Sequence, residues 1–213
     1  MAEHMRISKL LSLMLRHRPE EFGLNMDPYG FILLDEVIRA VQERYPEVVE
    51  EDIRTLVEGS EQRRFEIGEK GIRALYGHSF FVEMDGEPMD PPEYLYMGCL
   101  SQDIRRFRTE GIMPVDRFYV HLSVERETAE ERSKQADGPC VVQILARRAQ
   151  EKGVQFFSRG NVALTRGIPP EFVGEFFGLE EEGGQLDSLE DGKEPQGGLN
   201  YGRRPRKATG RRR

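Results

Sequence analysis

The chain has 213 residues, of which 38% are hydrophobic and 32% are charged, and its formal net charge is −7 with a pI near 5.3. This is enough apolar material for a packed core in one large or two small domains. The acidic balance argues against a general nucleic-acid coat protein, which is usually basic overall.

Cysteine content and hydropathy point to an intracellular protein. Cys99 and Cys140 form neither a metal-ligand spacing nor a disulfide framework, so we expect a reducing, cytoplasmic location. The N-terminal segment lacks a signal-peptide cleavage pattern. No stretch approaches the roughly 18 apolar residues that a membrane-spanning helix needs, so no membrane association is expected.

The first 60 residues are predicted to form three short helices. Apolar residues recur at helical spacing from 7 to 14, and Pro19 ends that pattern. Asp35 is placed to cap a second helix that reaches Tyr45, and a third helix ends at Gly59.

A β-hairpin is predicted to follow these helices. Residues 63–79 alternate like two strands around a turn at Gly68. Three helices followed by a hairpin are typical of a winged-helix lobe, which we assign to residues 1–86. Segment 86–92 is rich in Gly and Pro and marks the domain boundary.

The second half of the chain is predicted to consist mostly of strands. A helix capped by Ser101 ends at Gly111, and the expected strands are 94–100, 118–124, 140–146, 154–157 and 161–165, the last two joined at Ser158–Gly160. There is no βαβ repeat and no GxGxxG, so we predict the α+β fold class, and the pattern argues against a Rossmann fold even if a nucleotide is bound.

Composition changes again at residue 180. Residues 180–213 are acidic and glycine-rich, then basic, and have too few apolar residues to order themselves, so we predict a disordered tail. Two interpretations stay open for the basic end: it adds non-specific phosphate affinity, or it is a solvated tail.

The first chemical candidate is the pair Arg16 and His17 at a helix end. A guanidinium holds a phosphate through two parallel hydrogen bonds, and an imidazole donates or accepts a proton. The same pair also fits an ordinary helix end, because cations there interact favourably with the helix dipole.

Arginines around the predicted hairpin are the next candidates. Either Arg63 or Arg64 faces a ligand while Phe65 packs inward, or both lie on a solvated hairpin edge. Arg73 is a further candidate phosphate contact or simply a charge on a strand face.

Two polar clusters complete the set. Gly77 is followed by the short polar side chains of His78 and Ser79. This segment either lets a nucleotide approach the backbone closely or is only the end of a strand. Arg117, His121 and Ser123 are spaced to share one strand face, which faces either a ligand or water. Together these residues indicate only a protein that handles phosphates or nucleotides.

Several segments, in order, resemble the RNA 2′-phosphotransferase family, which removes the splice-junction 2′-phosphate from tRNA in eukaryotes. They are Ser8–His17, Arg64-Phe65, Ile72–Ala74 with Gly77–Ser79, Leu95-Tyr96 with Gly98, Val120–Ser123 and Phe157-Ser158. Their collinearity from residue 5 to about 178 is more specific than any single motif.

The resemblance implies a fold and a reaction. The winged-helix lobe is joined to an ADP-ribosyltransferase-like lobe with a split antiparallel β core, at residues 87–179. The RNA 2′-phosphate attacks C1″ of NAD⁺ and expels nicotinamide, and the ribose 2″-OH of this phospho-ADP-ribosylated RNA then attacks phosphorus. The products are 2′-OH RNA and ADP-ribose 1″,2″-cyclic phosphate. The implied partners are NAD⁺ and 2′-phosphorylated RNA, above all tRNA. We expect a monomer that uses no metal.

The resemblance also implies roles for residues. It places Arg16, His17, Arg64 and Arg117 in the catalytic set, with Arg63 as a register alternative to Arg64. The positions matched to the NAD⁺ cleft are His78, Ser79, Tyr96, Gly98, His121 and Ser123.

Two positions depart from the family pattern. Met97 stands where the family usually has a histidine that contacts the NAD⁺ ribose, and methionine cannot make that ring hydrogen bond. Tyr76 stands where glutamine is common. Neither change touches the catalytic set.

Two other functions are considered. One is an ADP-ribosyltransferase that modifies nucleic-acid phosphate ends or protein and stops after the first step, but the arginine set serves the phosphate of the second step. The other is a winged-helix regulator that senses a nucleotide. The acidic helix predicted at residues 50–58 disfavours that regulator, because it would approach DNA poorly.

Overall fold

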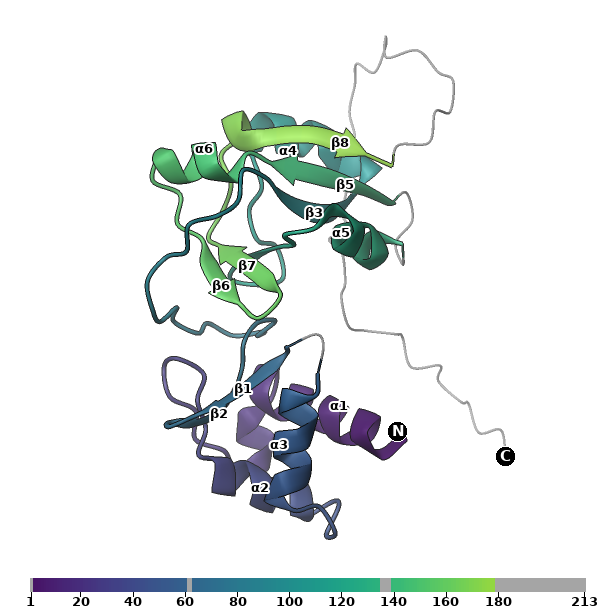
Figure 1. Cartoon of the computed structure of the whole chain (residues 1–213), viewed down its shortest axis with the longest axis vertical. Helices are drawn as coiled ribbons and strands as arrows, with labels where there is room; N and C mark the ends of the chain where they lie inside the picture. Colours follow the sequence, from purple (N-terminus) through teal and green to yellow (C-terminus); the bar gives the residue numbers. More distant parts are fainter. Residues whose placement is uncertain (1, 61–62, 135–138, 179–213) are drawn as a thin grey trace, which may run out of the picture.

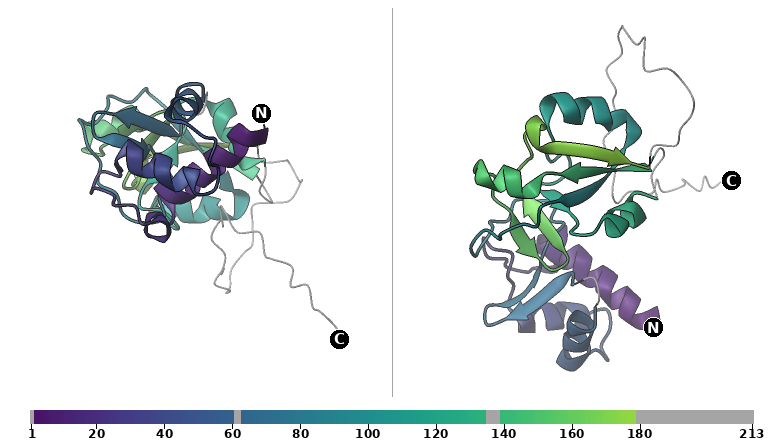
Figure 2. Two further views of the ribbon diagram at one scale, coloured as in Figure 1. Left: turned by 90° about the horizontal axis from the view of Figure 1, so that it is seen from below. Right: turned by 45° about the horizontal axis from the view of Figure 1, so that its top comes forward.

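The structure is a computed structural model that describes residues 2–60, 63–134 and 139–178, so the predicted tail lies outside the described residues. Helices and small antiparallel sheets gather around two large hydrophobic cores, stacked along the long axis of the molecule (Figures 1 and 2). We call residues 2–86, around the first core, the N-terminal lobe and residues 87–178 the C-terminal lobe. The α+β class predicted from the sequence is confirmed.

The N-terminal lobe consists of three helices and a hairpin. Its elements are α1 (Ala2–Arg16), the 3-10 helix η1 (Pro19–Phe22), α2 (Leu34–Gln42), α3 (Glu50–Glu58), β1 (Phe65–Gly68) and β2 (Gly71–Ala74). The strands pair antiparallel, with Phe65 opposite Ala74. The predicted order of three helices and a hairpin is therefore confirmed.

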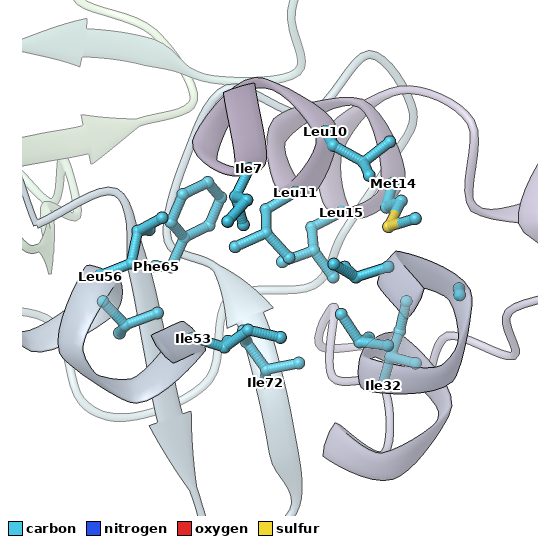
Figure 3. Close-up of a cluster of buried hydrophobic side chains, with 14 of the residues drawn as sticks. Ile7, Leu10, Leu11, Met14, Leu15, Ile32, Ile53, Leu56, Phe65 and Ile72 are labelled. Atoms are coloured by element: carbon cyan, nitrogen blue, oxygen red, sulfur yellow. The ribbon is translucent and has the colours of Figure 1, made fainter. Parts of the chain in front are cut away.

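The apolar side of α1 fills the first core. Its buried residues recur three and four positions apart, which lines one face of a helix. Figure 3 shows Leu11 and Leu15 of α1 directed toward Ile53 of α3 and Ile72 of β2. This packing fixes α1, and with it the residues at its C-terminal end.

The C-terminal lobe holds two three-stranded antiparallel sheets. The first has the order β3 (Leu95–Leu100), β5 (Pro139–Ile144), β8 (Val173–Phe177), and the second β4 (Val120–Leu122), β7 (Val162–Thr165), β6 (Phe157–Arg159). The sheets meet where Tyr96 and Ser123 exchange backbone hydrogen bonds of 2.9 and 2.7 Å. The remaining elements are η2 (Ser101–Asp103), α4 (Ile104–Glu110), α5 (Arg126–Ser133), α6 (Ala146–Glu151) and η3 (Pro170–Phe172).

Helix α5 packs closely on β3 at Gly98. A Cβ at this position would lie 3.0 Å from the carbonyl oxygen of Ala129 and 3.0 Å from Cβ of Ser133. A residue with a side chain would therefore push α5 away from the sheet. At the next pair of opposite residues on β3 and β5, Cys99 and Cys140 face each other inside the second core.

The lobes are joined by polar contacts and by a small apolar cluster, in which Tyr76 and Met84 pack against Tyr119, Val162 and Leu164. In Figures 1 and 2, β6 and β7 form the part of the C-terminal lobe nearest the N-terminal lobe. Arg159 of β6 donates hydrogen bonds to the carboxylate and to the backbone carbonyl of Asp85. The Tyr119 hydroxyl donates to the carbonyl oxygen of Val82 at 3.1 Å.

Several predicted helix boundaries were wrong. Asp35 lies inside α2 and does not cap it, since the N-cap residue is Leu33, and the helix ends before Tyr45. Ser101 begins a 3-10 turn in place of capping a helix through its side chain. Gly59 does end α3, as predicted.

Predictions in the C-terminal lobe also needed correction. The strand expected at 118–124 is limited to 120–122, and the hairpin turn falls at Gly160-Asn161, because Ser158 and Arg159 belong to β6. Helices α5 and α6 and strand β8 were not predicted. Helix α5 is highly charged and buries only Ala129 and Ser133, so its sequence carries no clear helical pattern.

Across the described ranges, no helix combines the length and the apolar character that crossing a bilayer would require.

Candidate active site

A cavity of about 500 Å³ lies between the two lobes and is lined by residues of both. The N-terminal lobe supplies Arg16, His17, Tyr76 and Gly77. The C-terminal lobe supplies Met97, Gly98, Arg106, Phe107, Ile112, Met113, Arg117, His121, Ser123 and Arg132, among others. Residues more than 100 positions apart in the sequence therefore face one space.

Arg16, the last residue of α1, is held by aromatic rings. Its Cζ lies 4.9 Å from the centre of the Tyr76 ring and 5.5 Å from that of Phe65. Nη2 donates a weak 3.4 Å hydrogen bond to the carbonyl oxygen of Arg64. Nε is buried and has no hydrogen-bond partner among the described residues. A buried donor of this kind is costly unless a ligand accepts from it.

Cations surround Arg16. Burial lowers the pKa of Arg16 to about 10; Tyr76 opposes this shift, and the charges of Arg64 and Arg117 add to it. Burial also lowers the pKa of Arg117, against the influence of Asp116. Both guanidinium groups remain charged at neutral pH. Several cations held together in a partly buried site favour an anionic ligand such as a phosphate.

His17 follows Arg16 and lines the same cavity. Its backbone N–H still bonds the carbonyl oxygen of Leu13 at 3.2 Å, which keeps it on the last turn of α1. Burial lowers the pKa of His17, and the charges of Arg117, Arg16 and Arg18 lower it further. The imidazole is therefore neutral at pH 7, and a bound anion would raise its proton affinity.

Arg117 reaches the site from the C-terminal lobe. It lies in a bend before β4, where its side chain lines the cavity. Nη1 donates a 2.7 Å hydrogen bond to the carbonyl oxygen of Gly77. Gly77 has a φ of +87°, and a Cβ there would lie 3.4 Å from Nη1 of Arg16. The glycine thus lets both arginines approach the same backbone position.

Two polar residues, one on β4 and one just after it, also face the cavity. His121 on β4 meets Tyr76 edge-on, with ring centroids 6.1 Å apart, and burial lowers its pKa to about 4. The hydroxyl of Ser123 accepts a 3.2 Å hydrogen bond from Nη1 of Arg132. The cavity therefore offers a neutral imidazole and a further arginine, Arg132, at this end.

Comparison with known proteins identifies the family. The family model described as "RNA 2′-phosphotransferase, Tpt1 / KptA family" matches residues 2–167, which include every residue that lines the cavity. The chain belongs to the RNA 2′-phosphotransferase family. The resemblance inferred from the sequence motifs is thereby confirmed.

Relatives in archaea and bacteria support the same family. A probable RNA 2′-phosphotransferase of Thermococcus kodakarensis is 37% identical over 173 residues, covering 80% of this chain and 96% of that protein. A protein of the same name from Acetivibrio thermocellus is 33% identical over 175 residues, covering 80% of this chain and 96% of that protein. Another, from Pectobacterium atrosepticum, is 37% identical over 173 residues, covering 79% of this chain and 96% of that protein. These matches extend over both lobes.

The structure of this family member brings together only part of the predicted catalytic set. Arg16, His17 and Arg117 line the cavity, whereas the side chain of Arg64 does not. Arg64 contributes its backbone carbonyl to Arg16 and accepts from the Leu75 N–H at 2.9 Å. Its charge acts on Arg16, so it lies close to the site, and its catalytic role stays a prediction.

Only some of the residues predicted to contact NAD⁺ line the cavity. Gly98, His121 and Ser123 line the cavity. Ser79 instead donates its N–H and its hydroxyl to the carbonyl oxygen of Arg16, at 2.9 and 3.2 Å, and so closes the end of α1. His78 is half-buried and lines the small neighbouring cavity, and Tyr96 joins the two sheets through its backbone.

The two additional predicted phosphate contacts lie outside the cavity. Arg73 is buried and forms ion pairs with Glu66 at 2.9 Å and Asp85 at 2.8 Å, so its contacts indicate a structural role. Arg63 has a φ of +39°, and its carbonyl oxygen packs against Gly160 of the C-terminal lobe. Neither arrangement supports the phosphate-binding prediction, which stays untested.

Sequence reasoning missed several residues of this cavity. Arg132 on α5 and Arg106 on α4 add cations, and segment 112–115 adds an apolar wall. No pattern marked these positions, because their helices are charged on most sides. Among the described residues of this family member, no group of three or more His, Cys, Asp and Glu side chains is arranged to hold a metal ion.

Proposed function

We propose that the protein removes an internal 2′-phosphate from RNA, above all at tRNA splice junctions, and transfers it to NAD⁺. The products are RNA with a 2′-OH, nicotinamide and ADP-ribose 1″,2″-cyclic phosphate. The observation that carries the proposal is that Arg16 and His17 of one lobe and Arg117 of the other face a single cavity. Membership of the RNA 2′-phosphotransferase family supports the RNA substrate.

The proposal extends to the fold. Three helices and a hairpin support a winged-helix domain at residues 1–86. Two small antiparallel sheets that meet at one edge support an ADP-ribosyltransferase-like domain at residues 87–179. The cavity lies where these domains meet, so RNA and NAD⁺ would be brought together there.

The residues of the cavity suit NAD⁺. Its volume of about 500 Å³ falls within the range of small-molecule sites, roughly 300–1,000 Å³. Arg106 and Arg132 offer charge for a diphosphate, while Phe107 and Ile112 offer apolar contact for flat rings. When bound, NAD⁺ would supply an electrophilic ribose carbon with nicotinamide as its leaving group.

The arginines of the chain would serve the phosphate. Transfer at phosphorus builds negative charge on the non-bridging oxygens, and fixed guanidinium groups stabilise that charge without reorganising. Nε of Arg16 is a buried donor that a phosphate oxygen would satisfy. Arg117 would approach the same phosphate from the opposite lobe.

His17 would serve the proton transfers. It is neutral at pH 7 in the absence of ligand and lies next to Arg16. The neutral imidazole would accept the proton of the ribose 2″-OH as that oxygen attacks phosphorus, and the imidazolium would then donate this proton to the RNA 2′-oxygen that leaves. His17→Ala should therefore slow turnover more than it weakens RNA binding.

The deciding assay uses an RNA with one internal 2′-phosphate, incubated with and without NAD⁺. We expect loss of the phosphate only with NAD⁺, with nicotinamide and ADP-ribose cyclic phosphate as products. No NAD⁺-dependent loss of the 2′-phosphate would contradict the proposal. Stable ADP-ribosylated RNA as the sole product would indicate an ADP-ribosyltransferase that stops after the first step.

Arg64 and Arg63 can be separated by the same assay. Arg64→Ala keeps the backbone carbonyl that holds Arg16 and removes only the guanidinium, so it should slow turnover by orders of magnitude with an unchanged circular dichroism spectrum. Arg63→Ala is the matched control and should retain turnover. The opposite result would assign the catalytic role to Arg63.

A further inference from the structure

Two exposed phenylalanines from different lobes contact each other. Phe81 of the N-terminal lobe is 53% exposed, and Phe118 of the C-terminal lobe is 47% exposed. Their ring centroids are 5.6 Å apart and the ring planes are inclined by 76°. Large aromatic side chains are rarely left this open without a partner when they lie together.

The rest of the lobe contact holds these rings in place. Phe81 stacks on Tyr119, with centroids 6.5 Å apart and planes inclined by 24°. Tyr119 is itself buried, and its hydroxyl bonds the carbonyl oxygen of Val82. Phe81 is therefore supported on one side and open to solvent elsewhere.

This aromatic corner, Phe81 with Phe118, adjoins the proposed active site. Phe118 follows Arg117, which lines the main cavity. A small second cavity is lined by Phe118 together with Gly77 and Arg117, and these last two also line the main cavity. The corner thus lies beside Arg117, one of the groups that would hold the phosphate.

We propose that the aromatic corner stacks one unpaired base of the RNA substrate, that of a nucleotide adjoining the 2′-phosphate. Proteins recognise single-stranded RNA by stacking splayed bases on aromatic side chains. Two rings at nearly a right angle accept one flat base, face-on to one ring and edge-on to the other. This inference rests on the proposed function, because it assumes an RNA phosphate beside Arg117.

A base fits the corner better than a second protein does. Stable protein interfaces bury at least about 1,200 Å² in total, far more than two phenyl rings provide. The charge of Arg117, the residue before Phe118, complements an RNA backbone. The corner would therefore select substrates in which the nucleotide beside the 2′-phosphate is unpaired.

The test measures binding without turnover. Fluorescence anisotropy, with no NAD⁺, would give the Kd of a single-stranded RNA carrying one internal 2′-phosphate, for the wild type and for Phe81→Ala, Phe118→Ala and the double variant. We expect each alanine to weaken binding about tenfold, by loss of stacking. Leu33→Ala, a change at a 61% exposed residue elsewhere on the N-terminal lobe, should leave the Kd unchanged.

RNAs that lack one base separate the contribution of base stacking to the Kd from that of the phosphate contacts. The same oligonucleotide with an abasic site on either side of the phosphate should bind the wild type about tenfold more weakly at one of the two positions. For that RNA, the alanine variants should bind no more weakly than the wild type. Phe118→Leu, which keeps apolar bulk without an aromatic face, should behave like the alanine variant while its thermal unfolding stays that of the wild type.

Three results would overturn the inference. One is a Kd that the phenylalanine changes do not affect, and another is an equal loss for intact and abasic RNA, which would indicate a structural role. The third is a wild-type dimer in sedimentation that the variants lose, which would show a self-association surface. Because binding is read without NAD⁺, a failure of the phosphotransfer reaction leaves these results interpretable.

Discussion

Nη1 of Arg117 donates a 2.7 Å hydrogen bond to the carbonyl oxygen of Gly77, so a side chain of the C-terminal lobe is fixed on the backbone of the N-terminal lobe. Arg16 lies against the same glycine. The distance between the two arginines therefore depends on how the lobes pack, and changes at the lobe contact should affect catalysis.

Gly77→Ala is expected to lower 2′-phosphotransfer by at least about tenfold. The new methyl would meet Nη1 of Arg16 at 3.4 Å in a backbone with φ of +87°, so the guanidinium must shift. Gly86→Ala is the control, because Gly86 has φ of +79° and nothing within 4 Å of a new Cβ. Both variants should lose about 1 kcal/mol of stability, measured by urea unfolding, but only Gly77→Ala should lose activity. Equal activity in the two would refute a role for this close approach.

Asp85→Asn should destabilise the protein by about 1–3 kcal/mol in urea unfolding. Its carboxylate lies between Arg73 and Arg159, and these arginines lower the pKa of Asp85 against the effect of burial. Without the charge, Arg159 loses its ion pair with Asp85, and Arg73 keeps only its ion pair with Glu66. Glu21→Gln breaks the exposed ion pair with Arg18 and should cost less than about 1 kcal/mol. Similar losses for the two variants would show that the Asp85 contacts do not hold the lobes.

Stability should fall as pH decreases from about 6.5 toward 4, partly through His121. Burial, aided by the charge of Arg117, lowers the folded-state pKa of His121 from 6.5 to about 4. In that window the unfolded chain binds the proton and the folded protein does not, so acid favours unfolding. Between about pH 7.5 and pH 5 this residue should account for on the order of 2 kcal/mol.

Urea unfolding of His121→Gln at the two pH values measures this contribution. The variant should lose less stability than the wild type on acidification. His4→Gln, at an exposed position on α1, should reproduce the wild-type dependence. An unchanged pH dependence in His121→Gln would mean that another group is responsible.

Met97→His should lower the KM for NAD⁺ severalfold with a smaller change in kcat. Met97 lines the cavity at the position where the resemblance implies a histidine in contact with the NAD⁺ ribose. A ring nitrogen would restore a hydrogen bond that the thioether cannot make. Met113→His changes another methionine of the same cavity, one that is 65% exposed, and should leave the KM unchanged. A higher KM in Met97→His would show that the methionine is itself adapted to the co-substrate.

Local patterns in the sequence were sufficient for the order of helices and strands in the N-terminal lobe, but not for every helix boundary. The spacing of apolar residues predicted α1, and strand alternation predicted the β1–β2 hairpin, because neighbours in the chain decide both features. The turn lies at residues 69–70, one position after the predicted Gly68, which is the last residue of β1. The collinear motifs were sufficient for the family, which the comparisons confirm. They also led to Arg16, His17 and Arg117, which face one cavity.

Only the tertiary structure decided which side chains meet. Arg117 lies in a bend before β4 and donates a hydrogen bond to the carbonyl oxygen of Gly77, 40 residues earlier in the chain. Arg132 lines the site from α5, a helix without apolar periodicity. Arg73 and Ser79 looked like ligand contacts in the sequence, but Arg73 pairs with Asp85 and Ser79 closes α1. Polar side chains satisfy whichever partner packing brings near, so residue type and spacing identify candidates, and the contact between the lobes selects among them.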